Sequence, residues 1–124
     1  MNFIYIFMIC AVGYGAIEIL WRNKTHWTMI LCGGISGNAI IATTRILSDF
    51  DTFFQSVISG LAITLVELSV GIILNIKQGK KIWDYSSLAF NYKGQICLRY
   101  SIYWVIISYF LINLYNISLL TVKI

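Results

Sequence analysis

Two glutamates occur inside otherwise apolar stretches, and their side chains are the ones best placed to do chemistry. Glu67 lies within the apolar stretch from about Phe53 to Asn75. An acidic residue in the middle of a membrane helix costs roughly 2.5–3.5 kcal/mol on insertion scales, so it should face protein or water and have a partner. Glu67 is therefore predicted either to form a cation or proton site or to pair with Arg99, Arg45 or a Ser or Thr hydroxyl.

Glu18 lies nearer the end of the first apolar stretch and has two interpretations. It precedes Arg22 by four residues, a spacing that places both side chains on one helical face and favours a local salt bridge. The alternative is that Glu18 joins Glu67 in one substrate or ion site between helices.

A second group of polar and aromatic residues is crowded into the longest joint between apolar stretches, from Ile76 to Gln95. Asp84 and Asn91 are candidates for the substrate or ion site, although both residue types also cap helices and satisfy loop backbone groups. The other polar, aromatic and glycine residues of this joint predict either a gate-like, re-entrant segment or a well-ordered structural loop. These residues are Trp83, Tyr85, Ser86, Phe90 and Gly94.

Helices across a bilayer must position these residues. The chain has 124 residues, of which 59% are hydrophobic and 11% charged, and its mean hydropathy is +0.80, whereas a soluble domain is about 25% charged. At about 20 residues per helical span, four spans and short joints fill a single transmembrane domain, residues 1–124. We predict an all-α integral membrane four-helix bundle with spans at about 2–20, 28–46, 53–75 and 96–120.

Small residues indicate where these helices pack. Gly33 and Gly37 have the GxxxG spacing, and Ser56 and Gly60 repeat a small-xxx-small pattern on the third span; such residues let helix backbones approach closely in lipid. The two halves also share a plan, since residues 15–19 faintly resemble residues 64–68, each with a central Glu. Either two repeated helical pairs or chance similarity explains the resemblance.

The charges predict the orientation. With four spans, the first and third joints lie on one side, and they carry Arg22, Lys24, Lys77, Lys80, Lys81 and Lys93. Positive residues mark the cytoplasmic side, so we expect a multi-pass protein of the cell membrane with both termini outside. Interfacial aromatic residues are typical of span ends and are predicted at Trp21, Trp27, Trp83 and Trp104.

Several other classes are disfavoured. The three cysteines (Cys10, Cys32 and Cys97) lack CxxC spacing, and His26 is the single histidine, so no metal or cofactor is predicted. We can assemble no nucleophile, base and orienting group, so no enzyme is expected. Because the basic residues lie where membrane orientation requires them, no nucleic-acid partner is expected either.

Two segments resemble a known family. The segment WDYSSLAFNYKGQICLRYSIYW, residues 83–104, is similar to the signature of the ABC-transporter type IV, or CmpB-like, membrane proteins: WDYS, a spacer, FN, a Gly, then a Cys and a Ser ahead of an aromatic. Residues 13–34, GYGAIEILWRNKTHWTMILCGG, resemble the openings of family members. Glu67 occupies the position of the family's Glu before the WDYS loop.

The resemblance implies a bacterial, multi-spanning membrane protein. The chain departs from longer members because it lacks their Asn-Arg-Gly and Gly-Pro loop and contains no proline. It also lacks the phosphate-binding pattern GxxxxGK[ST], so any ATPase would be a separate chain.

Two functions are consistent with these features. The first is a transport component or channel-like protein for a cation or small solute, as the intramembrane Glu67 suggests. The alternative is a structural or regulatory subunit that binds another membrane protein, since GxxxG surfaces invite partners. The expected partners are the lipid bilayer and either a second copy of the chain or another membrane protein.

Overall fold

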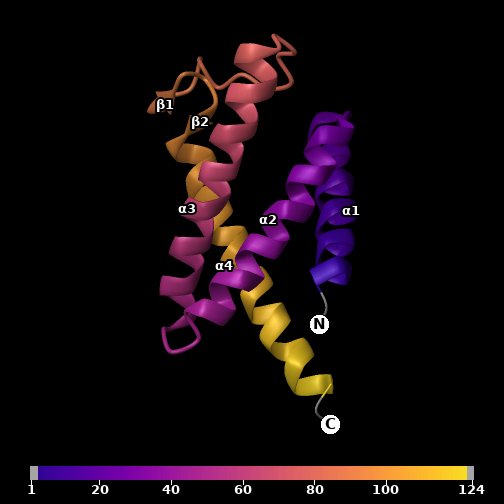
Figure 1. Ribbon diagram of the computed structural model, residues 1–124. Helices are drawn as coiled ribbons and strands as arrows, with labels where there is room; N and C mark the ends of the chain where they lie inside the picture. The colour runs from indigo at the N-terminus through magenta and orange to yellow at the C-terminus, as the bar shows by residue number, and fades with distance from the viewer. Residues whose placement is uncertain (1–2, 123–124) are drawn as a thin grey trace.

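The computed structural model describes residues 3–122 and consists almost entirely of helices (Figure 1). The four long helices are α1 (Phe3–Arg22), α2 (Trp27–Ile46), α3 (Thr52–Gly71) and α4 (Leu98–Val122). A π-helical turn, η1 (Ile72–Lys77), continues α3, and two-residue strands β1 (Asn91–Tyr92) and β2 (Ile96–Cys97) pair antiparallel ahead of α4. The predicted all-α bundle is confirmed. Of the predicted first span, Asn2 lies outside the described residues.

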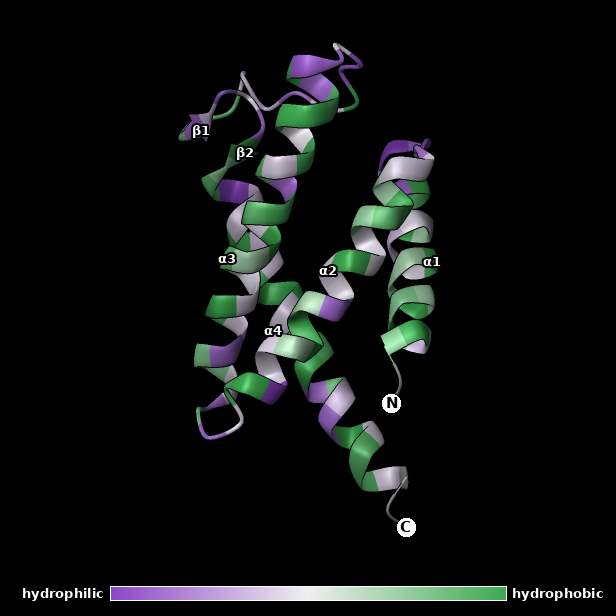
Figure 2. Ribbon diagram, viewed as in Figure 1, coloured by the Kyte–Doolittle hydropathy of each residue, from purple (hydrophilic) through white to green (hydrophobic). Residues whose placement is uncertain are grey.

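All four helices are long and apolar enough to cross a bilayer. Figure 2 shows apolar colour along the helices, with polar colour concentrated in the turns and at the end that carries the long loop. Many large apolar side chains point outward, among them Val12, 70% exposed, and Leu65, 63% exposed. In water such a surface would be unfavourable, whereas hydrocarbon solvates it. The chain is therefore a small multi-pass membrane protein.

Local signals set where two of the helices begin. The side chain of Asp51 accepts a hydrogen bond from the Phe54 amide at 2.7 Å and caps α3. His26 caps α2 in the same way, because its ring Nδ1 accepts from the Thr28 amide at 3.3 Å. These caps satisfy amides that the first turn of a helix leaves without partners.

The helices form two antiparallel hairpins. The backbone of α1 packs closely against α2, that of α3 packs against α4, and α2 joins the hairpins through its contact with α3. A buried apolar cluster lies where α2 meets the other hairpin, and its members are Ile6, Ile40, Ile41, Ile63, Ile112 and Tyr115. In Figure 1 the ribbon of α2 diverges from α3 toward the end that carries the long loop.

Small residues allow the close approach within each hairpin. A Cβ added to Gly33 would lie 2.6 Å from Tyr14 Cβ, and one added to Gly37 would collide with Cys10, so α1 lies directly on this face of α2. In the second hairpin, a Cβ on Gly60 would lie 3.0 Å from the backbone nitrogen of Val105. Ser56, one turn before Gly60, is completely buried.

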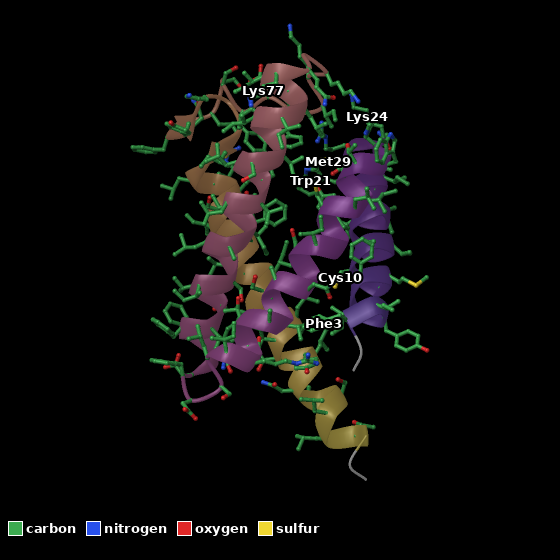
Figure 3. All side chains as sticks on the ribbon, in the orientation of Figure 1. Phe3, Cys10, Trp21, Lys24, Met29 and Lys77 are labelled. Atoms are coloured by element: carbon green, nitrogen blue, oxygen red, sulfur yellow. The ribbon has the colours of Figure 1, made fainter. Side chains whose placement is uncertain are left out.

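The first joint and the long loop lie at the same end of the molecule. Figure 3 shows Lys24 and Lys77 at this end, whereas α1 begins and α4 ends at the opposite one (Figure 1). This arrangement follows from four antiparallel helices, and it gathers the basic joints on one side, which we call the basic end.

Candidate functional site

Glu67 is the centre of the candidate site. Its side chain is buried in the C-terminal half of α3, with 8% of its surface exposed. The hydroxyl of Tyr85 donates a hydrogen bond to Oε2 at 3.0 Å, and the indole nitrogen of Trp104 donates to Oε1 at 3.4 Å. Each carboxylate oxygen thus receives a neutral donor. Among the described residues, no arginine, lysine, Ser or Thr partner of the kind expected from the sequence is found.

Aromatic rings from two helices and the long loop, residues 78–97, pack against the two side chains that donate to this carboxylate. Tyr85 from the loop stacks on Tyr100 of α4, with ring centroids 4.8 Å apart and planes 8° apart. Trp104 lies one turn further along α4, 6.4 Å from the Tyr100 ring. Tyr14 of α1 approaches Trp104 from the other hairpin, also at 6.4 Å.

Glu18 belongs to the same region. It is 7% exposed and lies one helical turn after Tyr14 on α1. The Tyr14 hydroxyl and the Cys32 thiol are each within electrostatic range of both Glu18 and Glu67. Glu18 is also the sixteenth residue of α1, as Glu67 is of α3, so the two glutamates occupy equivalent positions in their hairpins.

The local salt bridge predicted between Glu18 and Arg22 finds no support in the structure. Arg22 is exposed at the end of α1, and within the part of the chain that the structure describes it makes no ion pair with Glu18. We call the group that converges on Glu67 the aromatic–acidic cluster; it comprises Tyr14, Glu18, Glu67, Tyr85, Tyr100 and Trp104.

The long loop is held in place by buried polar side chains. Asn75 of η1 accepts from the Ile82 amide at 2.7 Å and donates to Gln95 Oε1 at 2.8 Å. Trp83 is 4% exposed, and its indole nitrogen donates to the Gln95 carbonyl at 2.9 Å. Gly71 leaves room for these contacts, since a Cβ there would lie 2.6 Å from Gln95 Oε1. The anchored loop fixes the backbone from which Tyr85 reaches Glu67.

The other predicted loop residues shape the turns of the long loop. Asp84 accepts from the Ser86 amide at 2.9 Å, and Asn91 accepts from the Gly94 amide at 3.0 Å. Gly94 has φ +72°, which suits glycine. Phe90 is 81% exposed. Of the residues proposed for a substrate or ion site, the structure brings Glu67 and Glu18 to one region and leaves Asp84 and Asn91 in the loop.

Two loop groups show altered proton affinity. The hydrogen bond from the Ser86 amide lowers the pKa of the exposed Asp84 carboxyl. Burial, followed by the negative charge of Glu67, raises the pKa of the Tyr85 hydroxyl above its ordinary range. Tyr85 therefore keeps its proton and acts as a hydrogen-bond donor.

The four tryptophans predicted at span ends lie in different surroundings. Trp21 and Trp27 are 78% and 63% exposed near the basic end, as interfacial residues are. Trp83 is instead buried in the loop anchor, and Trp104 contacts Glu67. Tyr14, Tyr100 and Cys32 were not assigned to the site from the sequence. The spacing of four residues between Tyr14 and Glu18, and between Tyr100 and Trp104, was the available signal.

The described residues contain no group of three or more His, Cys, Asp or Glu side chains that could hold a metal ion. The site is thus two carboxylates among aromatic rings, within the apolar part of four membrane-spanning helices. This combination defines a small multi-pass membrane protein with a buried acidic centre.

Comparison with protein families identifies the family to which the chain belongs. The model of the family described as "Putative ABC-transporter type IV" matches residues 2–123, nearly the whole chain, and the protein belongs to this family. Comparison with curated proteins and with solved structures gives no significant match.

Proposed function

We propose that this protein is a membrane transport component, or a small channel-like protein, that binds a cation at Glu67 and Glu18. The observation that carries the proposal is the environment of Glu67. Its carboxylate is buried in a membrane-spanning helix, and its hydrogen-bond donors, Tyr85 and Trp104, are both neutral.

Electrostatics explains why this environment favours a cation. Neutral donors stabilise a carboxylate in part, but they leave a net negative charge in a low-dielectric region. Glu18 adds a second acidic group within range of the same Tyr14 and Cys32 side chains. A positively charged ligand between the two hairpins would offset the cost of burying the Glu67 charge and that of burying the Glu18 charge.

We also propose the orientation and setting of the protein. The basic end carries the first joint and the long loop, so by the positive-inside rule it faces the cytoplasm and both termini lie outside. The setting we propose is a bacterial cell membrane. In this orientation the aromatic–acidic cluster lies in the cytoplasmic half of the bilayer, below a loop that faces the cytoplasm.

The test is cation flux in liposomes that contain the purified protein. We expect Glu67→Gln to reduce flux by roughly tenfold or more, since a charge-assisted interaction is worth about 1.5–3 kcal/mol. Asp49→Asn is the matched control, because Asp49 is an exposed acidic residue in the turn at the opposite end. Equal flux through the wild-type and Glu67→Gln proteins would contradict the proposal.

A second function is favoured by the packing of α1. Its backbone packs on α2, and its outer face leaves Ile9 62% and Leu20 84% exposed. A structural or regulatory subunit could use this face against a second copy or another membrane protein. Purification in a mild detergent should then give a homodimer or a stoichiometric complex, and a monomer without a partner would argue against this function.

A further inference from the structure

A groove opens between the α2–α3 turn and the last turns of α4, at the end of the molecule opposite the basic end. Its volume is about 450 Å³, and its polar lining includes Arg45, Ser48, Asp51, Tyr115 and Asn116. Figure 1 shows α4 continuing past the turn that joins α2 to α3, so this part of α4 forms one wall. Because three membrane-spanning helices begin or end beside the groove, it lies at the level of the lipid headgroups.

Arg45 is held at the groove by contacts from two other helices. Its Nε and Nη2 donate to the hydroxyl of Tyr115 on α4 at 3.3 and 3.2 Å, and its guanidinium lies 4.8 Å from the centroid of the Phe3 ring on α1. Among the described residues, Arg45 is the one basic side chain at this end of the molecule. The positive-inside rule gathers cations at the opposite end, so it does not account for an arginine here.

The hydroxyl of Tyr115 is a second feature that points to a ligand. Tyr115 is 8% exposed and lines the groove. Its hydroxyl oxygen accepts from Arg45, but no acceptor for the hydroxyl's own proton is found within the described part of the chain. A buried donor without an acceptor is unfavourable. An anionic phosphate oxygen in the groove would accept from this hydroxyl and from the arginine together.

The groove also carries a negative charge, which limits the ligands that suit it. Asp51 lines the groove, and one of its carboxylate oxygens accepts from the Phe54 amide at 2.7 Å to cap α3. A carboxylate has sites for about four hydrogen bonds, so the cap leaves room for another donor. An anionic headgroup would bring an unbalanced negative charge close to Asp51. A zwitterionic headgroup instead supplies a partner for Asp51 and for Arg45.

We propose that this groove binds the headgroup of a phospholipid that carries a primary ammonium group, of which phosphatidylethanolamine is the simplest. The phosphate accepts hydrogen bonds from Arg45 and Tyr115, and the ammonium donates to Asp51. Phe50 and Leu119, which also line the groove, contact the glycerol and the first carbons of the acyl chains. The inference goes beyond the proposed function, because none of these residues belongs to the aromatic–acidic cluster.

The test is binding of defined lipids to the delipidated full chain, measured by native mass spectrometry in detergent. Phosphatidylethanolamine is compared with phosphatidylcholine and phosphatidylglycerol that have the same acyl chains. We expect one phosphatidylethanolamine molecule to bind about fivefold or more tightly than either of the others. The choline headgroup donates no hydrogen bond to Asp51, and the glycerol headgroup has no cation. Equal binding of the three lipids by the wild-type protein would overturn the proposal, and this comparison needs no variant.

Variants with matched controls test the two charged residues. Arg45→Gln should weaken binding of phosphatidylethanolamine about tenfold, whereas Arg22→Gln, at the basic end, should change it by less than about twofold. Asp51→Asn keeps a capping side chain and should bring the affinities for phosphatidylethanolamine and phosphatidylglycerol to within about twofold. Asp49→Asn, in the same turn but not on the lining of the groove, should keep the preference. Equal effects of a variant and its control would overturn the assignment of that residue to the site.

A soluble headgroup distinguishes a lipid from a free phosphate ester. Glycerophosphoethanolamine has the same charges but no acyl chains, so it cannot make the apolar contacts with Phe50 and Leu119. It should compete at least about tenfold more weakly than phosphatidylethanolamine. Competition as strong as that of the lipid would overturn the lipid assignment and show that the groove takes a soluble phosphate ester.

Discussion

The hydroxyl of Tyr85 donates a hydrogen bond to Glu67 Oε2 at 3.0 Å, and this contact joins the long loop to a carboxylate inside a membrane helix. The loop and the buried acid are therefore one structural unit. A change that moves the loop therefore also moves the hydroxyl that donates to Glu67. A change of charge at Glu67 likewise alters the hydrogen bond that holds Tyr85.

The first prediction concerns this contact. Tyr85→Phe keeps the ring stacked on Tyr100 and removes the donor, so we expect the free energy of unfolding to fall by about 1–2 kcal/mol. The measurement is thermal unfolding in detergent, followed by circular dichroism. In a double-mutant cycle with Glu67→Gln, the two effects should be non-additive.

Tyr92→Phe is the matched control, since Tyr92 is 53% exposed in the same loop, and its effect should stay below about 0.5 kcal/mol. Equal losses of stability for Tyr85→Phe and Tyr92→Phe would show that the contact with Glu67 does not hold the loop.

The second prediction concerns close packing in the second hairpin. Gly60→Ala should lower the free energy of unfolding by about 1–3 kcal/mol, the usual cost of overpacking, because its Cβ would press on the backbone of Val105. Gly13→Ala is the control, since no heavy atom lies within 4 Å of the added Cβ there. Alanine favours a helix over glycine, so Gly13→Ala should be neutral or slightly stabilising. Similar effects at both glycines would rule out close packing at Gly60.

The third prediction concerns the anchor of the long loop. Asn75→Ala removes the acceptor of the Ile82 amide and the donor to Gln95. Unpaired buried polar groups cost about 1–3 kcal/mol, so local opening of the loop should increase about tenfold. Tryptic cleavage after Lys80 and Lys81 reports this opening.

Asn113→Ala provides the comparison, because the half-buried Asn113 bonds within its own helix, to the Tyr109 carbonyl. It should leave the rate of loop cleavage unchanged. If Asn75→Ala is cleaved no faster than Asn113→Ala, then Asn75 does not anchor the loop.

The fourth prediction concerns pH. Because the pKa of Asp84 is lowered in the folded protein, its ionised form stabilises the turn at pH values above its ordinary pKa of 3.8. That contribution is lost as the pH falls through the lowered pKa. The chemical shift of the Ser86 amide should therefore titrate with a midpoint below 3.8. A midpoint at or above that value would show that the carboxylate does not accept this hydrogen bond.

The fifth prediction concerns orientation. In a cysteine-free background, the Lys80→Cys variant should react with an impermeant maleimide only after the cells are opened. Residue 80 is at the basic end, which we propose faces the cytoplasm. Asp49→Cys lies in the turn at the other end and should react in intact cells. The reverse labelling pattern would place both termini in the cytoplasm.

Much of the fold followed from the sequence because hydrophobic composition decides it. Four apolar stretches of about 20 residues leave helices as the predicted way to satisfy the backbone in hydrocarbon. The helix ends agree with the predicted spans to within a few residues, and this holds for the third span too, which continues as η1 to Lys77. The glycines at positions 33, 37 and 60 also lie at helix contacts, as their spacing predicted, because only small residues permit such close approach of two helices.

The sequence by itself therefore determined that the chain is a membrane bundle, that Glu67 is its unusual charge and that the basic joints share one end. Only the tertiary structure decided the partners of Glu67. Trp104 and Tyr14 come from helices far apart in the chain, and Tyr85 comes from a loop whose path depends on Asn75, Trp83 and Gln95. Hydropathy is a local property that can be read residue by residue, whereas contacts across hairpins depend on how the helices are rotated and packed.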